Sequence, residues 1–167
     1  MLDVPPMSDA SPVRPRTVAL GADHAGYALK DHLAASLRAQ GHAVRDLGTF
    51  GPERVDYPDV AHRVARAVAG GTAELGVLVC GTGIGMSIAA NRHPGIRCAL
   101  VHDVTSARLA REHNDANVLA LGARMLGEMV ALDCLATFLA TAFEGGRHSH
   151  RLAKLTPDHT VSERSAA

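Results

Sequence analysis

The stretch VLVCGTGIGMSIAANR, residues 77–92, carries an apolar run directly into a glycine-rich turn and then into a helical pattern. The run that it continues, LGVLVC (75–80), has no charged residue, which is typical of a strand buried on both faces of a parallel sheet. Glycines at positions 81, 83 and 85 allow a tight turn, and the residues to about Asn91 predict a helix. A buried strand, a turn and a helix in this order indicate an α/β fold.

The same alternation continues on both sides of this stretch. Further short apolar runs predict strands at 17–22, 42–48, 97–103 and 117–123. Helical patterns lie between them: leucines at 29, 33 and 37 before Gly41, valines at 60, 64 and 68 behind Pro58, and the stretches 104–113 and 127–143. Five strands alternating with five helices predict a parallel sheet that is covered on both faces.

Length and composition predict one domain. The chain has 167 residues, 47% apolar and 20% charged, which is the ordinary globular range. Four of the eight prolines fall in residues 1–16, which lack hydrophobic periodicity and predict a flexible N-terminal tail. The last twelve residues, 156–167, predict a second flexible tail. The organised domain is therefore expected over 17–155.

The charge and residue usage exclude several classes of partner. Basic and acidic residues number 17 each, so no overall basic field is present to attract nucleic acid or an anionic membrane. Aromatic residues are 3% of the chain, too few for a base-stacking platform. No apolar run approaches about 18 residues, so no transmembrane helix is expected. Three widely spaced cysteines without a CxxC pattern favour a reducing, cytoplasmic setting.

The chemistry is expected at the carboxyl ends of the strands, where folds of this kind bind ligands. Three predicted strands end there in polar or glycine-rich turns, Asp23-His24, Cys80-Gly81-Thr82 and His102-Asp103. The glycine turn can present backbone N–H groups to an anion, although tight packing alone also explains it. It is not a dinucleotide fingerprint, because Met86 and Ile88 stand where the third glycine would be, and it lacks the GK[ST] of a Walker loop.

Cys80 and His113 are the candidate proton-transfer groups. The sulfur of Cys80 would lie at a helix N-terminus, which lowers a thiol pKa and allows it to act as a base or nucleophile. The alternative is an inert core cysteine, the role expected for Cys98 and Cys134. His113 and Asn114 end a predicted helix just before the fifth strand, where a histidine is either an acid/base catalyst or merely compatible with the helix dipole. Asp23 is either a ligand or a helix cap.

The segment EGGRHSHRLAK (144–154) is locally basic. Arg147 and Arg151 share one face of a helix, and with Arg124 they suit a phosphate group. An exposed basic helix end is the alternative. The ten histidines show no HExxH motif and no completing pattern, so no metal site is predicted.

Together these motifs resemble the ribose-5-phosphate isomerase B family, which includes galactose-6-phosphate isomerase subunits. The resemblance rests on ALGADHAGYALKDHL, DYP (56–58), CGTGIGMSIAANR, SARLAREHNDANVLALGAR and EGGRH, and it covers about 17–155. It implies a three-layer α/β/α Rossmann-like sandwich with a five-stranded parallel sheet, and a homodimer or dimer of dimers whose active sites are shared between chains. It further implies isomerisation of a small phosphosugar through a cis-enediolate, in the pentose phosphate pathway, with neither metal nor cofactor.

The resemblance also implies a role for individual residues. Cys80 matches the base that moves a proton between C1 and C2, and His113 matches the acid/base that opens the furanose ring. Thr82 and the backbone amides from Gly81 to about Ser87 match an anion hole for the enediolate. The substrate-binding positions are Asp23, His24, Gly81, Gly83, Gly85, Ser87, Asn114, Arg124, Arg147 and Arg151.

Ribose 5-phosphate is the substrate expected first, since this chain carries Cys80, His113 and the arginines together. A galactose, allose or tetrose phosphate is the alternative with the same chemistry. A non-catalytic phosphosugar-binding protein would keep the arginines but have no use for Cys80 with His113. A nucleotide-binding regulatory domain is disfavoured by the failed fingerprint spacing.

Overall fold

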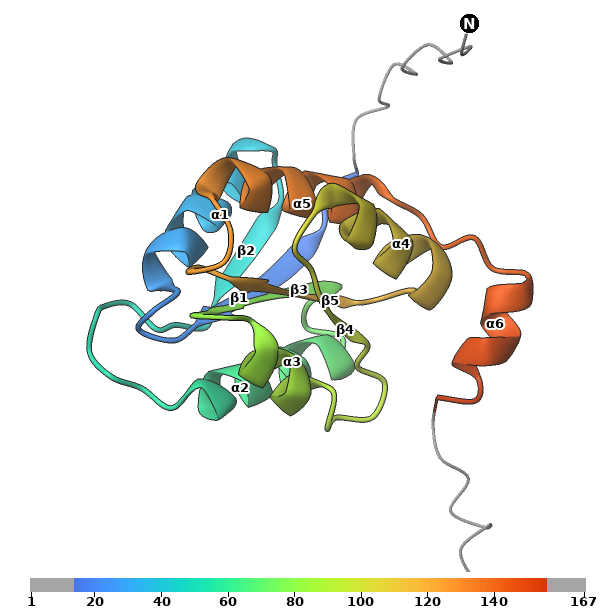
Figure 1. The fold of residues 1–167 in the computed structure, drawn as a ribbon, viewed down its shortest axis with the longest axis horizontal. Helices are drawn as coiled ribbons and strands as arrows, with labels where there is room; N and C mark the ends of the chain where they lie inside the picture. Colours follow the sequence, from blue (N-terminus) through green and yellow to red (C-terminus); the bar gives the residue numbers. More distant parts are fainter. Residues whose placement is uncertain (1–13, 156–167) are drawn as a thin grey trace, which may run out of the picture.

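The computed structural model describes residues 14–155 (Figure 1). The predicted tails at 1–13 and 156–167 lie outside the described residues. Residues 14–16, assigned to the N-terminal tail on sequence grounds, contact the domain. The side chain of Arg14 pairs with Glu74, and the backbone N–H of Arg16 donates to Nδ1 of His42 at 3.1 Å.

Five parallel strands form the sheet, in the order β2-β1-β3-β5-β4. They are β1 (Thr17–Ala22), β2 (Ala43–Asp46), β3 (Leu75–Cys80), β4 (Cys98–Leu100) and β5 (Val118–Gly122). The predicted strands are all confirmed, and the three inner strands match their predicted ranges to within a residue. Strand order reverses direction between β1 and β3, which places the carboxyl ends of these two strands side by side.

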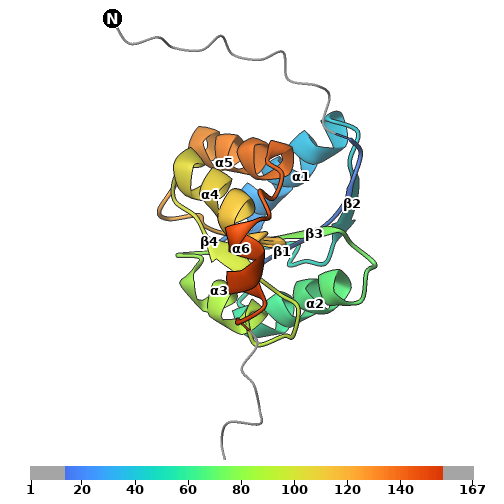
Figure 2. The ribbon, with the colours of Figure 1, turned by 90° about the vertical axis from the view of Figure 1, so that its right-hand side faces the viewer.

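Helices cover both faces of the sheet (Figures 1 and 2). On one face lie α1 (Tyr27–Ala39), α4 (Val104–Asn114) and α5 (Glu128–Ala140), and on the other lie α2 (Tyr57–Ala69) and α3 (Ile84–Ala90). Each side has its own apolar core, around Leu33 and Phe138 on the first and around Val64 and Met86 on the second. The predicted three-layer sandwich is confirmed. No helix among residues 14–155 has the length and apolarity that crossing a membrane requires.

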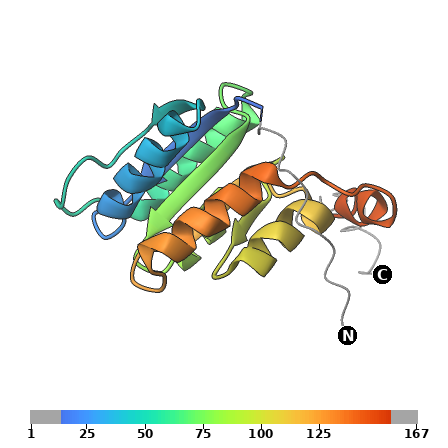
Figure 3. The same cartoon turned by 90° about the horizontal axis from the view of Figure 1, so that it is seen from above.

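A sixth, short helix, α6 (Arg147–Leu152), lies outside these layers and packs against α4. Figure 3 shows it at the end of the molecule away from the arrowheads of the strands. This position follows from the chain direction: α5 runs antiparallel to the strands, so the segment after it leaves the sheet at the amino-terminal edge.

The two edge strands are shorter than predicted because their last residues make turns. Asp46 pairs with the buried Lys30 and accepts the N–H of Gly48 through Oδ1, which ends β2 early. Asp103 accepts the N–H of Ser106 at 2.8 Å and so becomes the N-cap of α4. The His102-Asp103 turn, expected to be a third polar strand end, therefore serves the start of a helix.

Gly26 sets how closely the turn after β1 approaches β3. A Cβ atom at this position would stand 2.5 Å from the carbonyl oxygen of Val79. Beside it, the N–H of Asp23 donates to the same oxygen at 3.1 Å. Glycine at position 26 thus allows the turn after β1 to lie in contact with the end of β3.

We predict that Gly26→Ala lowers the free energy of unfolding by about 1–3 kcal/mol, because backbone atoms of β3 cannot yield to the methyl group as a flexible side chain would. The matched control is Gly127→Ala, since a Cβ there has no neighbour within 4 Å. Urea unfolding followed by circular dichroism measures both. Equal stability of the two variants would contradict the close approach.

Candidate active site

Cys80 ends β3 and is 5% exposed. Its Sγ accepts the backbone N–H of Gly83 at 3.1 Å. Gly83 is the N-cap of α3 and has a left-handed φ of 78°, a conformation that glycine adopts without strain. This N–H group fixes the sulfur at the start of the glycine loop, where it faces the residues that follow the strand.

Some amides of the glycine loop are bonded within the loop, and others have no partner among residues 14–155. The N–H of Ile84 donates to Oγ1 of Thr82 at 3.3 Å, and the N–H of Ser87 donates to the carbonyl of Gly83. The Ser87 hydroxyl donates to the carbonyl of Ile84 at 2.8 Å. Within residues 14–155, the N–H groups of Gly81 and Thr82 have no partner and remain available. Both donors of Ser87, its backbone N–H and its hydroxyl, are already bonded within the loop.

Asp23 and His24 follow β1 at the neighbouring strand end. Asp23 is 8% exposed, and its Oδ1 accepts the N–H groups of Ala25 and Gly26. This fixes the carboxylate and leaves Oδ2 for a ligand. Nδ1 of His24 is enclosed without a hydrogen-bond partner. Such an orphaned polar atom is suited to an oxygen of a bound molecule.

Arg124 approaches the same place from β5. The backbone N–H of Arg124 donates to the carbonyl of Gly81 at 3.0 Å. A Cβ on Gly81 would stand 3.5 Å from Nη1 of the Arg124 side chain. The guanidinium group therefore lies over the glycine loop. We call this cluster the strand-end half-site; it comprises Asp23, His24, Cys80, Gly81, Thr82, Gly83, Gly85, Ser87 and Arg124.

Tyr57 lies beside the strand-end half-site and was not singled out from the sequence. A Cβ on Gly85 would stand 2.6 Å from the ring of Tyr57 and 2.9 Å from its hydroxyl oxygen. The residue is 40% exposed. In the sequence, DYP indicated only the start of a helix; its place among the family motifs was the signal for a further role.

The remaining predicted residues form a second cluster on α4 and α6, which we call the helix half-site: His113, Asn114, Arg147 and Arg151. His113 and Asn114 are in the last turn of α4, and the two arginines are on α6. The ring of His113 stacks on His148, with centroids 4.3 Å apart and an interplanar angle of 9°.

One chain does not bring the two half-sites together. Val118, at the start of β5, pairs with Gly76, and Gly122 pairs with Cys80. Four residues of strand span about 13 Å. His113 lies in the last turn of α4, just before β5 begins, so it lies at the amino-terminal edge of the sheet, whereas Cys80 lies at the carboxyl edge. The idea that all the chemistry gathers at the carboxyl ends is wrong for a single chain.

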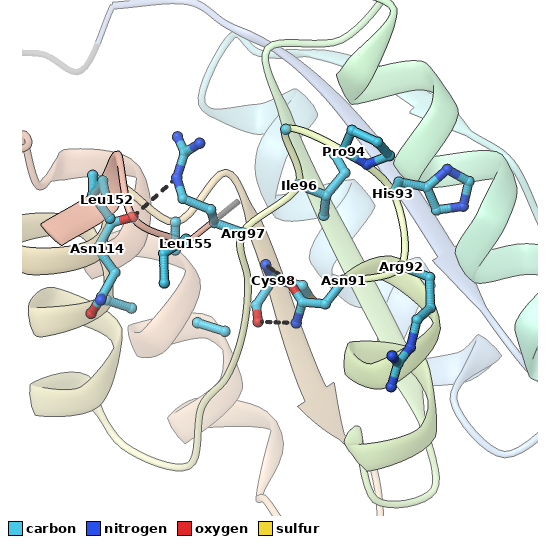
Figure 4. Close-up of a pocket in the computed structure, with 14 residues that line it drawn as sticks. Asn91, Arg92, His93, Pro94, Ile96, Arg97, Cys98, Asn114, Leu152 and Leu155 are labelled. Carbon is cyan, nitrogen blue, oxygen red and sulfur yellow. Dashed lines mark hydrogen bonds between the residues drawn. The ribbon is translucent and has the colours of Figure 1, made fainter. Parts of the chain in front are cut away.

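A groove of about 640 Å³ lies beside the helix half-site (Figure 4). Ile96, Cys98, Asn114, Leu152 and Leu155 are among its lining residues. The dashed line in Figure 4 from Arg97 to Asn114 is a hydrogen bond of 3.1 Å from Nε to the backbone carbonyl. The groove lies away from Cys80, so it is not the reaction site of this chain.

The helix half-site does not fit a metal ion. Among residues 14–155, His113, Glu144 and His148 have possible ligand atoms within 4.8 Å of one another. A shared ion must lie close to the plane of each imidazole ring, and two stacked rings have no plane in common. Arg147 and Arg151, on the same short helix as His148, also repel a cation.

The other cysteines differ from Cys80. Burial raises the pKa of the Cys98 thiol to about 12, and burial, followed by the charges of Asp103 and Asp133, raises the pKa of Cys134. Both thiols are therefore protonated at neutral pH, in agreement with their expected inert role.

Comparison with known proteins identifies the family. Residues 18–155 match the family model described as Ribose/Galactose Isomerase. Ribose-5-phosphate isomerase B of Escherichia coli K12 is 46% identical over 141 residues, 84% of this chain and 95% of that protein. D-erythrulose-4-phosphate isomerase of Pectobacterium atrosepticum is 42% identical over 83% of this chain and 92% of that protein. The solved structure of the Clostridium thermocellum ribose-5-phosphate isomerase B has a TM-score of 0.82 at 50% identity, over 83% of this chain and 93% of that one.

The fold and the cysteine-bearing half-site define an isomerase of sugar phosphates with a Rossmann-like α/β/α sandwich. The chain belongs to the ribose/galactose isomerase family, whose relatives of type B it matches over nearly their whole length. The resemblance drawn from the sequence motifs is confirmed.

We predict that iodoacetamide near neutral pH alkylates Cys80 before Cys98 and Cys134. Burial raises the pKa of the Cys98 and Cys134 thiols and keeps them protonated, whereas the Cys80 sulfur lies at a strand end and accepts the N–H of Gly83. Mass spectrometry of tryptic peptides at increasing times gives the order of labelling. Modification of Cys98 or Cys134 first would contradict this view of the loop.

Proposed function

We propose that this protein interconverts ribose 5-phosphate and ribulose 5-phosphate, without a metal, in the pentose phosphate pathway. The observation that carries the proposal is the Cys80 sulfur, held by the Gly83 N–H at the entrance of the glycine loop beside Asp23 and Arg124. Relatives named ribose-5-phosphate isomerase B support the choice of sugar. The three free cysteines support a reducing, cytoplasmic setting.

In the proposed reaction, the Cys80 thiolate removes the proton from C2 of the open-chain aldose and returns it to C1. The intermediate is a cis-enediolate, with negative charge on the former carbonyl oxygen. The N–H groups of Gly81 and Thr82, which have no partner within residues 14–155, and the Thr82 hydroxyl would stabilise this charge. Such donors lower the barrier more for the intermediate than for the substrate, so they accelerate the chemical step.

The helix half-site supplies the other functions in this proposal. His113 transfers the proton that opens the furanose ring, and Asn114 holds a sugar oxygen. Arg147 and Arg151 bind the phosphate, together with His24 and Arg124 from the other half-site. Binding a phosphate remote from C1 and C2 positions the reacting carbons.

These roles require two chains, so we propose a homodimer, or a dimer of dimers, with each active site shared. The support is the location of Cys80 and His113 at opposite ends of one sheet. A partner that brings its helix half-site to Cys80 must also cover α3, where Ile84 and Ile88 are each 51% exposed. Burying two such side chains favours association.

A four-carbon sugar phosphate is the second candidate substrate. The relative named D-erythrulose-4-phosphate isomerase, at 42% identity, favours it. The Cys80 chemistry would be unchanged, and only the space beside the glycine loop would differ.

We predict ribose 5-phosphate turnover that survives EDTA and falls by about 10²–10⁴-fold in Cys80→Ala, because the proton-transfer group is lost. Cys98→Ala is the matched control and retains turnover. A coupled assay compares ribose, allose, galactose and tetrose phosphates. Turnover of another sugar phosphate alone would reject the ribose 5-phosphate assignment and its pathway but agree with the proposed role of Cys80. Binding without turnover of any sugar phosphate would favour a non-catalytic binding protein.

We further predict that mixing Cys80→Ala with His113→Ala protein restores activity. Each mixed dimer has one site with both residues intact, so random exchange of equal amounts restores about one quarter of the wild-type sites. The two variants are inactive separately. If mixing under conditions that exchange subunits restores nothing, Cys80 and His113 do not act in a shared site.

A further inference from the structure

His148 has no part in the function proposed above, yet it is 5% exposed and lies against His113. The two rings are stacked, 4.3 Å between centroids and 9° from parallel. A charge on one ring therefore acts on the other at short range. His148 lies on α6, next to the arginines proposed to bind the phosphate and against His113, the residue proposed to transfer a proton.

Nε2 of His148 has two competing partners. It lies 3.4 Å from Nε of Arg147, which donates to it, and 3.4 Å from Oε2 of Glu144, which can only accept. One ring nitrogen cannot do both. With a lone pair, Nε2 accepts from Arg147; with a proton, it donates to Glu144 and loses Arg147.

The charged groups around the ring favour the first state when no anion is bound. His113 faces it from α4, Glu144 from the preceding segment, and Arg147 and Arg151 from α6. Burial first, and then the positive charges of His113 and Arg147, lower the pKa of His148 below its usual value. The neutral ring then accepts the hydrogen bond from Arg147.

We propose that His148 is a positioning residue that couples the binding of a phosphate at Arg147 and Arg151 to the proton state of His113. When Arg147 turns to an anionic group, Nε2 of His148 is released, takes a proton from solvent water and donates it in a hydrogen bond to Glu144. The inference rests on the proposed function for the roles of His113 and of the two arginines, and on the ring stack and the two contacts of Nε2 for the response of His148.

The consequence for His113 follows from the stack. A protonated His148 ring, 4.3 Å away, disfavours a second positive charge and keeps His113 neutral. A neutral imidazole can accept the proton of the sugar hydroxyl during ring opening. Binding of the phosphate end of the substrate would thus prepare the acid/base at the other end.

The test measures proton uptake on binding inorganic sulfate, a dianion that does not itself titrate near neutral pH. Calorimetry of the full-length protein in two buffers of different ionisation enthalpy gives the protons taken up per sulfate. We expect uptake by the wild type, loss of it in His148→Phe, which keeps a flat stacked ring, and reduction in Glu144→Gln. His150→Phe, an exposed histidine on the same helix, is the matched control and retains uptake.

The pH profile of kcat gives a second readout that a merely structural role would not move. In His148→Phe, the neighbour that can carry a charge against the stacked His113 ring is removed, so the acid limb is expected to shift to higher pH. Absence of sulfate binding or of uptake in the wild type, or unchanged uptake in both His148→Phe and Glu144→Gln, overturns the coupling. Proton uptake without isomerase activity supports the coupling and rejects the proposed function. Isomerase activity without proton uptake supports the proposed function and rejects the coupling.

Discussion

The direction of the parallel sheet is the constraint on which the site depends. All five strands point the same way, so the residues that follow β1, β3 and β5 meet at one edge, and those that precede a strand lie at the other. Cys80 ends the buried strand β3. Asp23 lies beside this end because its N–H donates to the Val79 carbonyl, and the Arg124 side chain lies over Gly81. The same polarity places His113, just before β5, at the far edge. The division of the chemistry into two half-sites is therefore a property of the topology and not of a few side chains.

The fold could be predicted from the sequence because its signals are local. A continuous apolar run such as LGVLVC has few alternatives to a buried strand, and the leucine and valine spacings identify the faces of α1 and α2. The strand-end half-site was also within reach, since it consists of residues directly after strands. The separation of His113 from Cys80 could have been inferred in the same way, because a residue before a parallel strand lies at its amino end.

What the sequence does not contain is the pairing between distant segments. The stack of His148 on His113 depends on where α6 settles after α5, and nothing in EGGRHSHRLAK specifies that contact. The ring of Tyr57 against Gly85 likewise depends on the packing of α2 beside α3. Hydrogen bonds inside the glycine loop are a third case. The left-handed Gly83 turns its own N–H toward sulfur, and the helix turn that follows uses both donors of Ser87, so a run of glycines offers fewer free amides than its length suggests.

The two half-sites differ in physical character, and the difference suits their separate tasks. The Cys80 end is held by buried backbone and by the approach of Gly26 to β3, which favours an unchanging geometry for the transfer of a carbon-bound proton. The α4–α6 end carries exposed arginines and two stacked imidazole rings. The homodimer proposed above would join a rigid reaction centre in one chain to a responsive binding element in the other. Neither property has to be compromised within one chain, because the length of the sheet keeps the two regions apart.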